Sequence, residues 1–310
     1  MSAPVKSANV VPICLHGNCF PIIHVPENAP EELEHAGTTI KFWLSGRQLL
    51  YKQARKNTGE DWSEKITSEL AGEVGLPTVY VELAIWKTIP GIVTGSFVQP
   101  GETFVEARDF RSHLLQQPRE NLPKLVLDEM FKMLEEVEPP LRWKLPKGLS
   151  NAADVFVGYL AFDAWICNED RHHGNWGVVD AGTPRYHLAP TFDHASSLGR
   201  EFTDEQRTVM LTTGQIDEFV GRCRSGIFAA PTAKDPLAVH ELLAQVALLR
   251  PAAVRYWLER ILALPVDSVE MLFDRLPTAL LTPIRKTMAL ELMSASRLRL
   301  KQLHSSLPPR

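Results

Sequence analysis

The sequence has few cysteines, no long uncharged apolar run and no large excess of charge of one sign. Only four cysteines occur in 310 residues, none of them in a C-x-x-C pair. Cys14 and Cys19 are spaced like half of a zinc site, but no second pair of ligands follows at the spacing of a zinc finger. We therefore expect reduced thiols, as in a cytoplasmic protein, and neither a disulfide framework nor a structural metal.

The missing apolar run and the near balance of charge argue against two further classes of protein. No stretch reaches the about 18 apolar residues that cross a membrane, and the run at 10–15 contains Pro12 and is too short for a secretion signal. The net charge of −4 argues against a nucleic-acid-binding surface over the whole molecule, although it allows a local basic cleft. The sequence therefore predicts cytoplasmic localisation, no membrane contact and no direct contact with nucleic acid.

What is present is a change of pattern along the chain, from short strand-like runs to amphipathic helices. Strand-like runs lie within four ranges: 36–44, 49–52, 79–85 and 91–98. Helical spacing is found at 62–74 and, beyond a break at Pro100 and Gly101, at 124–137, 151–167, 203–220, 236–248, 251–263 and 276–304. This pattern predicts an α+β fold in two lobes. A small β-rich lobe spans residues 1–99, and a larger, mostly helical lobe spans 100–310.

A short hairpin, predicted at 176–189, interrupts the helices and organises the polar residues around it. It follows the polar segment 168–175 (NEDRHHGN) and precedes Asp193. Because a hairpin returns the chain to the end from which it left, we expect Asn175 and Asp193 to lie near one another, with Asp170 on the same rim. Two oxygen ligands beside a second carboxylate suit a hard divalent cation that keeps several waters and shares nucleotide phosphates.

This arrangement fits phosphoryl transfer, which needs one carboxylate to accept the proton of the nucleophile and ligands that hold Mg²⁺ on the phosphates. We assign Asp170 as the base and Asn175 and Asp193 as the metal ligands. A structural role stays open, because Asp and Asn are common in loops, where they cap helices and turns. Zinc is disfavoured, because the adjacent His172 and His173 cannot both face one ion from a regular helix.

The N-terminal part would have to hold the triphosphate. Lys52 lies on a strand with apolar neighbours. The following helix offers Glu64 and Glu69 as partners, of which at most one points inward, and we assign Glu64, although Asp61 and Glu64 also fit a capping box. Gln99, at the junction of the two lobes, is positioned to face adenine with its backbone. In the segment 36–41, the nucleotide-binding candidates are small residues and a lysine, which permit close approach to phosphate: Gly37, Thr38, Thr39 and Lys41.

Four segments resemble the HipA-like serine/threonine kinases, which have a distant protein-kinase fold. The segment 168–175 resembles the N-x-D-R-H-x-x-N catalytic loop of that family. The segment 188–193 (LAPTFD) resembles its L-A-P-x-Y-D metal segment, with Phe192 in place of tyrosine. The segment 36–41 resembles its phosphate loop, and 64–76 resembles its E-(x)5-L-A-x(3)-G-L helix.

The resemblance implies an ATP- and Mg²⁺-dependent kinase that transfers the γ-phosphate to a Ser/Thr hydroxyl of a protein. Its implied partners are a protein substrate and a helix-turn-helix antitoxin. Asp170 is then the catalytic aspartate, Asn175 and Asp193 bind magnesium, and Lys52 binds the phosphates. The regulatory serine of many members is replaced here by Glu34. Two alternatives stay open: a lipid or small-molecule kinase with the same D-R-H-x-x-N chemistry, and a non-catalytic module that keeps the fold.

Overall fold

The computed structural model describes residues 19–29, 32–33, 39–44 and 46–308. Six strands form the first sheet in the order β1-β5-β6-β4-β3-β2, in which only β1 and β5 pair in parallel. Their bounds are β1 (Ile22–Val25), β2 (Glu32–Leu33), β3 (Lys41–Leu44), β4 (Leu49–Gln53), β5 (Val81–Trp86) and β6 (Ile89–Gly95). Among the expected site residues, Gly37 and Thr38 lie outside the described part of the chain.

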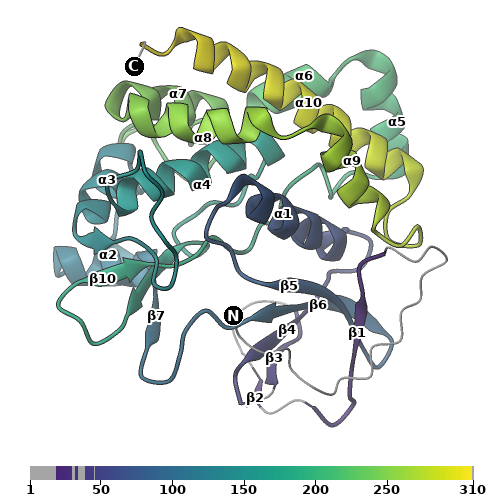
Figure 1. The fold of residues 1–310 in the computed structure, drawn as a ribbon, viewed down its shortest axis with the longest axis horizontal. Helices are drawn as coiled ribbons and strands as arrows, with labels where there is room; N and C mark the ends of the chain where they lie inside the picture. Colours follow the sequence, from purple (N-terminus) through teal and green to yellow (C-terminus); the bar gives the residue numbers. More distant parts are fainter. Residues whose placement is uncertain (1–18, 30–31, 34–38, 45, 309–310) are drawn as a thin grey trace.

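The pleat of β3 and β4 separates two kinds of side chain. Phe42 and Tyr51 are directly opposite each other and are buried in a small apolar cluster on one face of the sheet. Their neighbours Lys41 and Lys52 are likewise opposite each other and therefore project from the other face. Figure 1 shows the helix α1 (Glu60–Val74) lying against β5 of this sheet.

Helix α1 begins at Glu60, slightly before the expected start at residue 62, and is not capped by a side chain. Gly59, with a positive φ of 70°, occupies the N-cap position, and Asp61 lies inside the first turn. The Asp61–Glu64 capping box is therefore absent, because a helix that starts at Glu60 leaves Asp61 no N-cap position. At the other end Gly75, with φ of 86°, closes the helix as the sequence predicts.

A second sheet and nine further helices make up the remainder of the described chain. The sheet has the order β7-β9-β10-β8, and β9 pairs with β10 in antiparallel register, Val178 opposite Leu188. Its strands are β7 (Thr103–Glu106), β8 (Val137–Glu138), β9 (Gly177–Asp180) and β10 (Tyr186–Leu188). The helices are α2 (Ala107–Leu115), α3 (Leu127–Glu135), α4 (Ala152–Ile166), α5 (Asp204–Thr213), α6 (Ile216–Arg222), α7 (Val239–Leu249), α8 (Pro251–Ala263), α9 (Val266–Asp274) and α10 (Pro283–Ser306).

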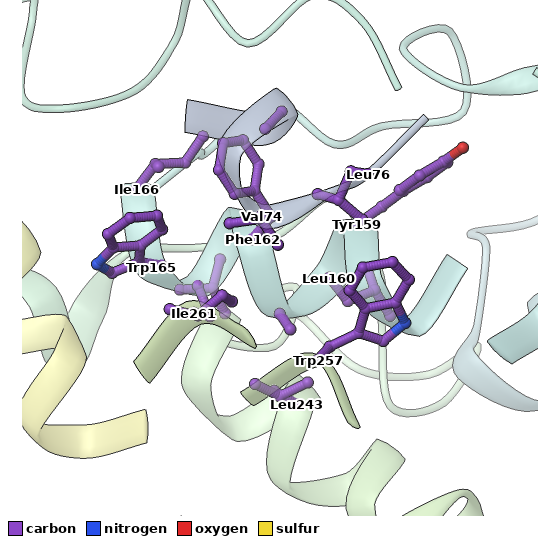
Figure 2. Close-up of a cluster of buried hydrophobic side chains, with 14 of the residues drawn as sticks. Val74, Leu76, Tyr159, Leu160, Phe162, Trp165, Ile166, Leu243, Trp257 and Ile261 are labelled. Atoms are coloured by element: carbon purple, nitrogen blue, oxygen red, sulfur yellow. The ribbon is translucent and has the colours of Figure 1, made fainter. Parts of the chain in front are cut away.

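Helix α4 is the centre of the main core. Almost all of its side chains are buried, which is typical of a helix that is apolar on every side. Figure 2 shows Tyr159, Phe162 and Trp165 of α4 packed between Val74 of α1 and Trp257 of α8. Because α4 is enclosed in this way, the polar segment that follows its C-terminus starts from a rigid support.

The cysteines do not all match the expectation of reduced thiols. Cys167 and Cys223 are free and buried, but Cys19 takes part in a disulfide, so the expectation of reduced thiols fails for Cys19. A low cysteine count therefore does not by itself predict that every thiol is reduced. Within the described residues, no helix is both long and apolar enough to cross a membrane.

Candidate active site

The segment after α4 is shaped by its own side chains. The helix ends at Cys167, which takes a left-handed conformation with φ of 52°. The Asn168 amide then donates to Asp163 Oδ1 at 2.8 Å and accepts from the backbone N–H of Asp170 at 3.2 Å. These bonds turn the chain sharply and fix the position from which Asp170 projects.

Arg171 joins this segment to the one that carries Asp193. Its fully buried guanidinium makes a bidentate pair with Asp163, at 2.8 and 2.9 Å. It also donates to Thr191 Oγ1 at 3.0 Å, to the carbonyl of Asn175 at 2.7 Å and to that of Phe192 at 3.4 Å. A buried charge needs this degree of pairing to be tolerated. Arg171 therefore fixes the backbone on both sides of the site.

The sequence motifs did not predict a role for Arg171 or for its partner Asp163. His194 was also missed: it is fully buried, and its Nε2 lies 2.7 Å from Thr191 Oγ1. Burial, followed by the charge of Arg171, lowers the pKa of His194 well below its usual value, so this ring is neutral. Arg171 itself could have indicated this network, because a charged residue directly after a long buried helix needs an acidic partner.

Asp170 and Asn175 are in direct contact. The Asn175 amide donates to the Asp170 carbonyl at 2.8 Å and to Asp170 Oδ2 at 3.0 Å. The other carboxylate oxygen, Oδ1, lies 3.4 Å from His172 Nε2, and His172 Nδ1 accepts the backbone N–H of Gly174 at 2.9 Å. Asp170 is thus oriented on one side while nearly half of its side chain remains exposed to solvent.

Asp193 faces the two lysines of the first sheet. It has a left-handed backbone, with φ of 59°, and its Oδ1 lies 3.5 Å from Lys52 Nζ. The charge of Lys52 is the main cause that lowers the pKa of Asp193, and Lys41 contributes in the same direction. Like charges directly opposite in an antiparallel pair are unfavourable. The Lys41–Lys52 pair therefore needs a nearby anion, and Asp193 supplies one.

Glu64 is completely buried next to this pair. Neither of its carboxylate oxygens makes a hydrogen bond of ordinary geometry, although the backbone N–H groups of Ala195 and Asp193 favour its charged form. Burial, followed by the charge of Asp193, raises the pKa of Glu64 to about 7, while the charge of Lys52 opposes the rise. Glu64 therefore acts on Lys52 through its charge, whereas the carboxylate within 4 Å of the Lys52 ammonium is that of Asp193.

These residues line one cavity of about 570 Å³. Its polar end contains Lys41, Lys52, Asp170, Asn175 and Asp193. Its other end, here called the aromatic end, is lined by apolar and aromatic residues: Trp43, Leu50, Val79, Phe97, Val98, Phe104 and Phe192. A smaller hollow of about 120 Å³ adjoins the polar end and is lined by Thr39, among others. The size and the mixture of apolar walls with few convergent polar groups are typical of small-molecule sites.

Three aromatic rings from separate segments define the aromatic end. Phe97 stacks on Phe192 at 5.7 Å between ring centroids, and Phe104 meets both rings edge-on, at 5.2 and 5.5 Å. Offset and edge-to-face geometries of this kind hold rings rigidly. A flat heterocyclic base fits against such a surface.

The residues that join the two sheets border the same end. The carbonyl of Ser96 and the N–H of Val98 make no hydrogen bond in the described structure, and both residues line the cavity. Gln99 does not line it: its N–H donates to Glu102 Oε2 and its carbonyl accepts the N–H of Glu102, both at 2.9 Å. The structure therefore does not bring Gln99 to the place expected for it, because a turn uses both of its backbone groups.

The donor set of the polar end suits magnesium better than zinc. No group of three or more His, Cys, Asp or Glu side chains with metal-binding geometry occurs in the described part of the chain. Asn175 and Asp193 offer oxygen ligands on the same cavity wall. Mg²⁺ is commonly held by one or two protein oxygens, with waters and phosphates completing its octahedron.

A larger hollow of about 1090 Å³ runs along α10, away from these residues. Two of its charged residues, Asp217 and Arg297, are already engaged. Asp217 is paired with Arg299 at 2.9 Å, and Arg297 donates to the carbonyls of Leu262 and Leu264 at the C-terminal end of α8. The smaller cavity is the better candidate site, because a carboxylate, an amide and two facing lysines line it together.

Comparison with known proteins adds evidence about the fold. No protein-family model and no curated protein matches this chain. Among solved structures, the proinflammatory kinase CtkA of Helicobacter pylori matches with a TM-score of 0.66 and 18% identity, over 88% of this chain and 91% of that one. HipA of Shewanella oneidensis, solved with HipB and operator DNA, matches with a TM-score of 0.56 and 13% identity, over 99% of this chain and 70% of that one. The chain therefore has a mixed α+β fold similar to the folds of HipA-like kinases.

Proposed function

We propose that this protein is an ATP- and Mg²⁺-dependent phosphotransferase of the HipA-like type, which moves the γ-phosphate of ATP to a Ser/Thr hydroxyl of a protein. The observation that carries the proposal is the convergence of a carboxylate, an amide and two facing lysines at one end of a cavity whose other end is aromatic. In this proposal the cavity lies between two lobes, residues 1–99 and 100–310.

Each end of the cavity has its own task. The aromatic end takes the adenine ring, with the Ser96 carbonyl and the Val98 N–H free to pair with its edge. Lys41 and Lys52 take the phosphates, which replace Asp193 as the anion between them. Thr39 borders the same phosphates, and the resemblance of the segment 36–41 to a phosphate loop assigns Gly37 and Thr38, which lie outside the described residues, to the same task. Glu64 keeps Lys52 in place through its charge.

Asn175 and Asp193 hold Mg²⁺, which neutralises charge on the phosphates when it is bound. Asp170 accepts the proton of the attacking hydroxyl. Asn175 orients Asp170 through the bond to Oδ2, so that Oδ1 faces the incoming acceptor. Arg171 keeps this arrangement by fixing the carbonyls of Asn175 and Phe192.

The HipA neighbour was solved with HipB and operator DNA. We extend this to a proposed antitoxin-type protein partner for this chain, with no direct contact between this chain and DNA. A lipid or small-molecule acceptor would use the same residues, so the choice of acceptor is decided by the transfer assay below.

Two measurements test the proposal. Mg²⁺ and ATP at about 100 times the dissociation constant stabilise a protein by about 2.7 kcal/mol, which for a domain of this size is a rise of roughly 5–10 °C in melting temperature. In a transfer assay with γ-labelled ATP, Asp170→Ala should lower transfer to protein by about 10²- to 10⁴-fold. The matched control is Asp235→Ala, at an exposed position without side-chain contacts. The absence of a Mg²⁺-dependent shift, or equal transfer by Asp170→Ala and wild type, would overturn the proposal.

A further inference from the structure

The segment that joins the two sheets, residues 96–102, is held by an ion pair with a distant loop. Arg142 Nη1 and Nη2 bond to Glu102 Oε1 and Oε2 at 2.6 and 2.7 Å. The same Nη2 donates to the carbonyl of Phe97 at 3.0 Å, and Glu102 Oε2 accepts the N–H of Gln99 at 2.9 Å. The two side chains therefore connect both ends of this segment to residue 142.

Arg142 follows a loop that is anchored to the second sheet. The loop before it continues directly from β8, and the carbonyl of Pro139 lies 3.0 Å from His187 Nδ1 of β10. Arg142 itself adopts a left-handed backbone, with φ of 58°. This conformation is unfavourable for a residue with a side chain, and it persists where surrounding structure imposes it.

The bond to the Phe97 carbonyl bears on the aromatic end of the cavity. The Ser96 carbonyl and the Val98 N–H, on either side of Phe97, make no hydrogen bond in the described structure, and both residues line the cavity. When Arg142 holds the Phe97 carbonyl, the Ser96 carbonyl and the Val98 N–H are left for a ligand on the other side. The Phe97 ring is fixed at the same time, against Phe104 and Phe192.

We propose that Glu102 and Arg142 form a clamp that positions the 96–102 segment and thereby sets the affinity and base selectivity of the nucleotide site. This inference rests on the proposed nucleotide-binding function. Both residues are positioning residues, because neither lines the cavity. The clamp acts on the binding of the base and leaves the chemistry at Asp170 unaffected.

An ordinary surface ion pair would have little effect of this kind. This pair differs in three respects: it is bidentate, its carboxylate is only 13% exposed, and each partner also holds a backbone group. The hydrogen bond from Arg142 lowers the pKa of Glu102, which keeps the carboxylate charged at neutral pH. Loss of either side chain leaves the Phe97 carbonyl or the Gln99 N–H without its partner, and the segment loses its fixed pattern of donors and acceptors.

The test measures dissociation constants of Mg²⁺–ATP and Mg²⁺–GTP by calorimetry, together with KM and kcat for ATP. Glu102→Gln and Arg142→Met should each weaken ATP binding by about tenfold, the loss of one set of charge-assisted hydrogen bonds. They should also reduce the preference for ATP over GTP and leave kcat within about twofold of wild type. The control is Asp217→Asn, which weakens a remote ion pair in which Arg299 donates twice to Asp217 Oδ1, and it should change none of these values.

The double variant Glu102→Gln/Arg142→Met provides a second test that does not depend on either single change alone. Because both residues belong to one unit, its loss of affinity should equal that of the weaker-binding single variant. Unchanged ATP affinity and ATP/GTP ratio in the single variants, or losses that add in the double variant, would overturn the clamp. A wild-type protein that binds neither nucleotide would instead overturn the proposed function, so the two failures are distinguishable.

Discussion

The two walls of the polar end differ in how their charges are balanced. Behind the wall that contains Asp170 and Asn175, the buried charge of Arg171 is compensated by Asp163 and by main-chain carbonyls, and every bond is made within the protein. On the other wall, Lys41 and Lys52 face each other across β3 and β4 with Asp193 as the nearby anion, and neither carboxylate oxygen of the buried Glu64 makes a hydrogen bond of ordinary geometry. The first wall is complete without a ligand, whereas the second has charges that a bound phosphate would balance. This difference predicts that the first wall serves stability and geometry, and the second serves affinity.

The largest effect on folding is expected from Arg171. Arg171→Met leaves Asp163 charged and buried with the Asn168 amide but without an opposite charge, and breaking a buried pair in this way costs about 3–5 kcal/mol of unfolding free energy. Arg171→Met/Asp163→Leu should recover part of this loss, because no isolated charge is then left. Urea unfolding measures both, with Arg222→Met as control, since Arg222 pairs with Glu218 at the exposed surface. A loss below about 1 kcal/mol for Arg171→Met would show that the first wall does not depend on this network.

For Lys41 we expect little change in stability but a loss of nucleotide affinity. Lys41→Met removes one of two facing like charges, so the ligand-free protein should be unchanged or more stable by about 0.5 kcal/mol. Nucleotide affinity should fall by about 10- to 100-fold, because a charge-assisted contact to phosphate is lost. The comparison uses calorimetric nucleotide binding beside urea unfolding, with Lys147→Met at an exposed site as control. A variant that loses stability but keeps its affinity would reverse the roles assigned to the two walls.

Local signals in the sequence were sufficient for the elements that carry the site. The apolar spacing of α1 and α4, Gly75, and the turn residues between β9 and β10 predicted these elements to within a few residues. Asp170, Asn175 and Asp193 line one cavity, as we expected from the position of the hairpin between Asn175 and Asp193. Each of these inferences depended on residues close together in the chain.

The features that sequence reasoning missed depend on contacts between distant segments. Strand β1 is four residues long and is stabilised by pairing with β5, so its own sequence gives little signal. The aromatic end combines Phe97, Phe104 and Phe192, which no local pattern relates. The helix expected at 276–304 instead begins at Pro283, because Thr282 caps it and proline is favoured in a first turn.

His240 is a buried polar group away from the cavity, and it can be compared with the charged groups of the two walls. It lies on α7, its Nε2 has no hydrogen bond in the described structure, and the charged groups that act on it are Arg299 and Asp217. Burial, followed by the charge of Arg299, lowers the pKa of His240 to about 4, whereas Asp217 opposes the shift. An unfolded histidine has a pKa of about 6.5, so between these values the unfolded chain binds more protons than the folded one.

The stability that neutral His240 contributes is therefore present above about pH 6.5 and is lost as the pH falls toward 4. His240→Gln removes this dependence. The unfolding free energy of wild type relative to His240→Gln should fall by on the order of 2 kcal/mol across this range, allowing for partial exposure. Urea unfolding at several pH values measures the difference, while nucleotide affinity at neutral pH should be the same in both proteins. A difference that does not change with pH would mean that His240 gains a partner or water in the folded state.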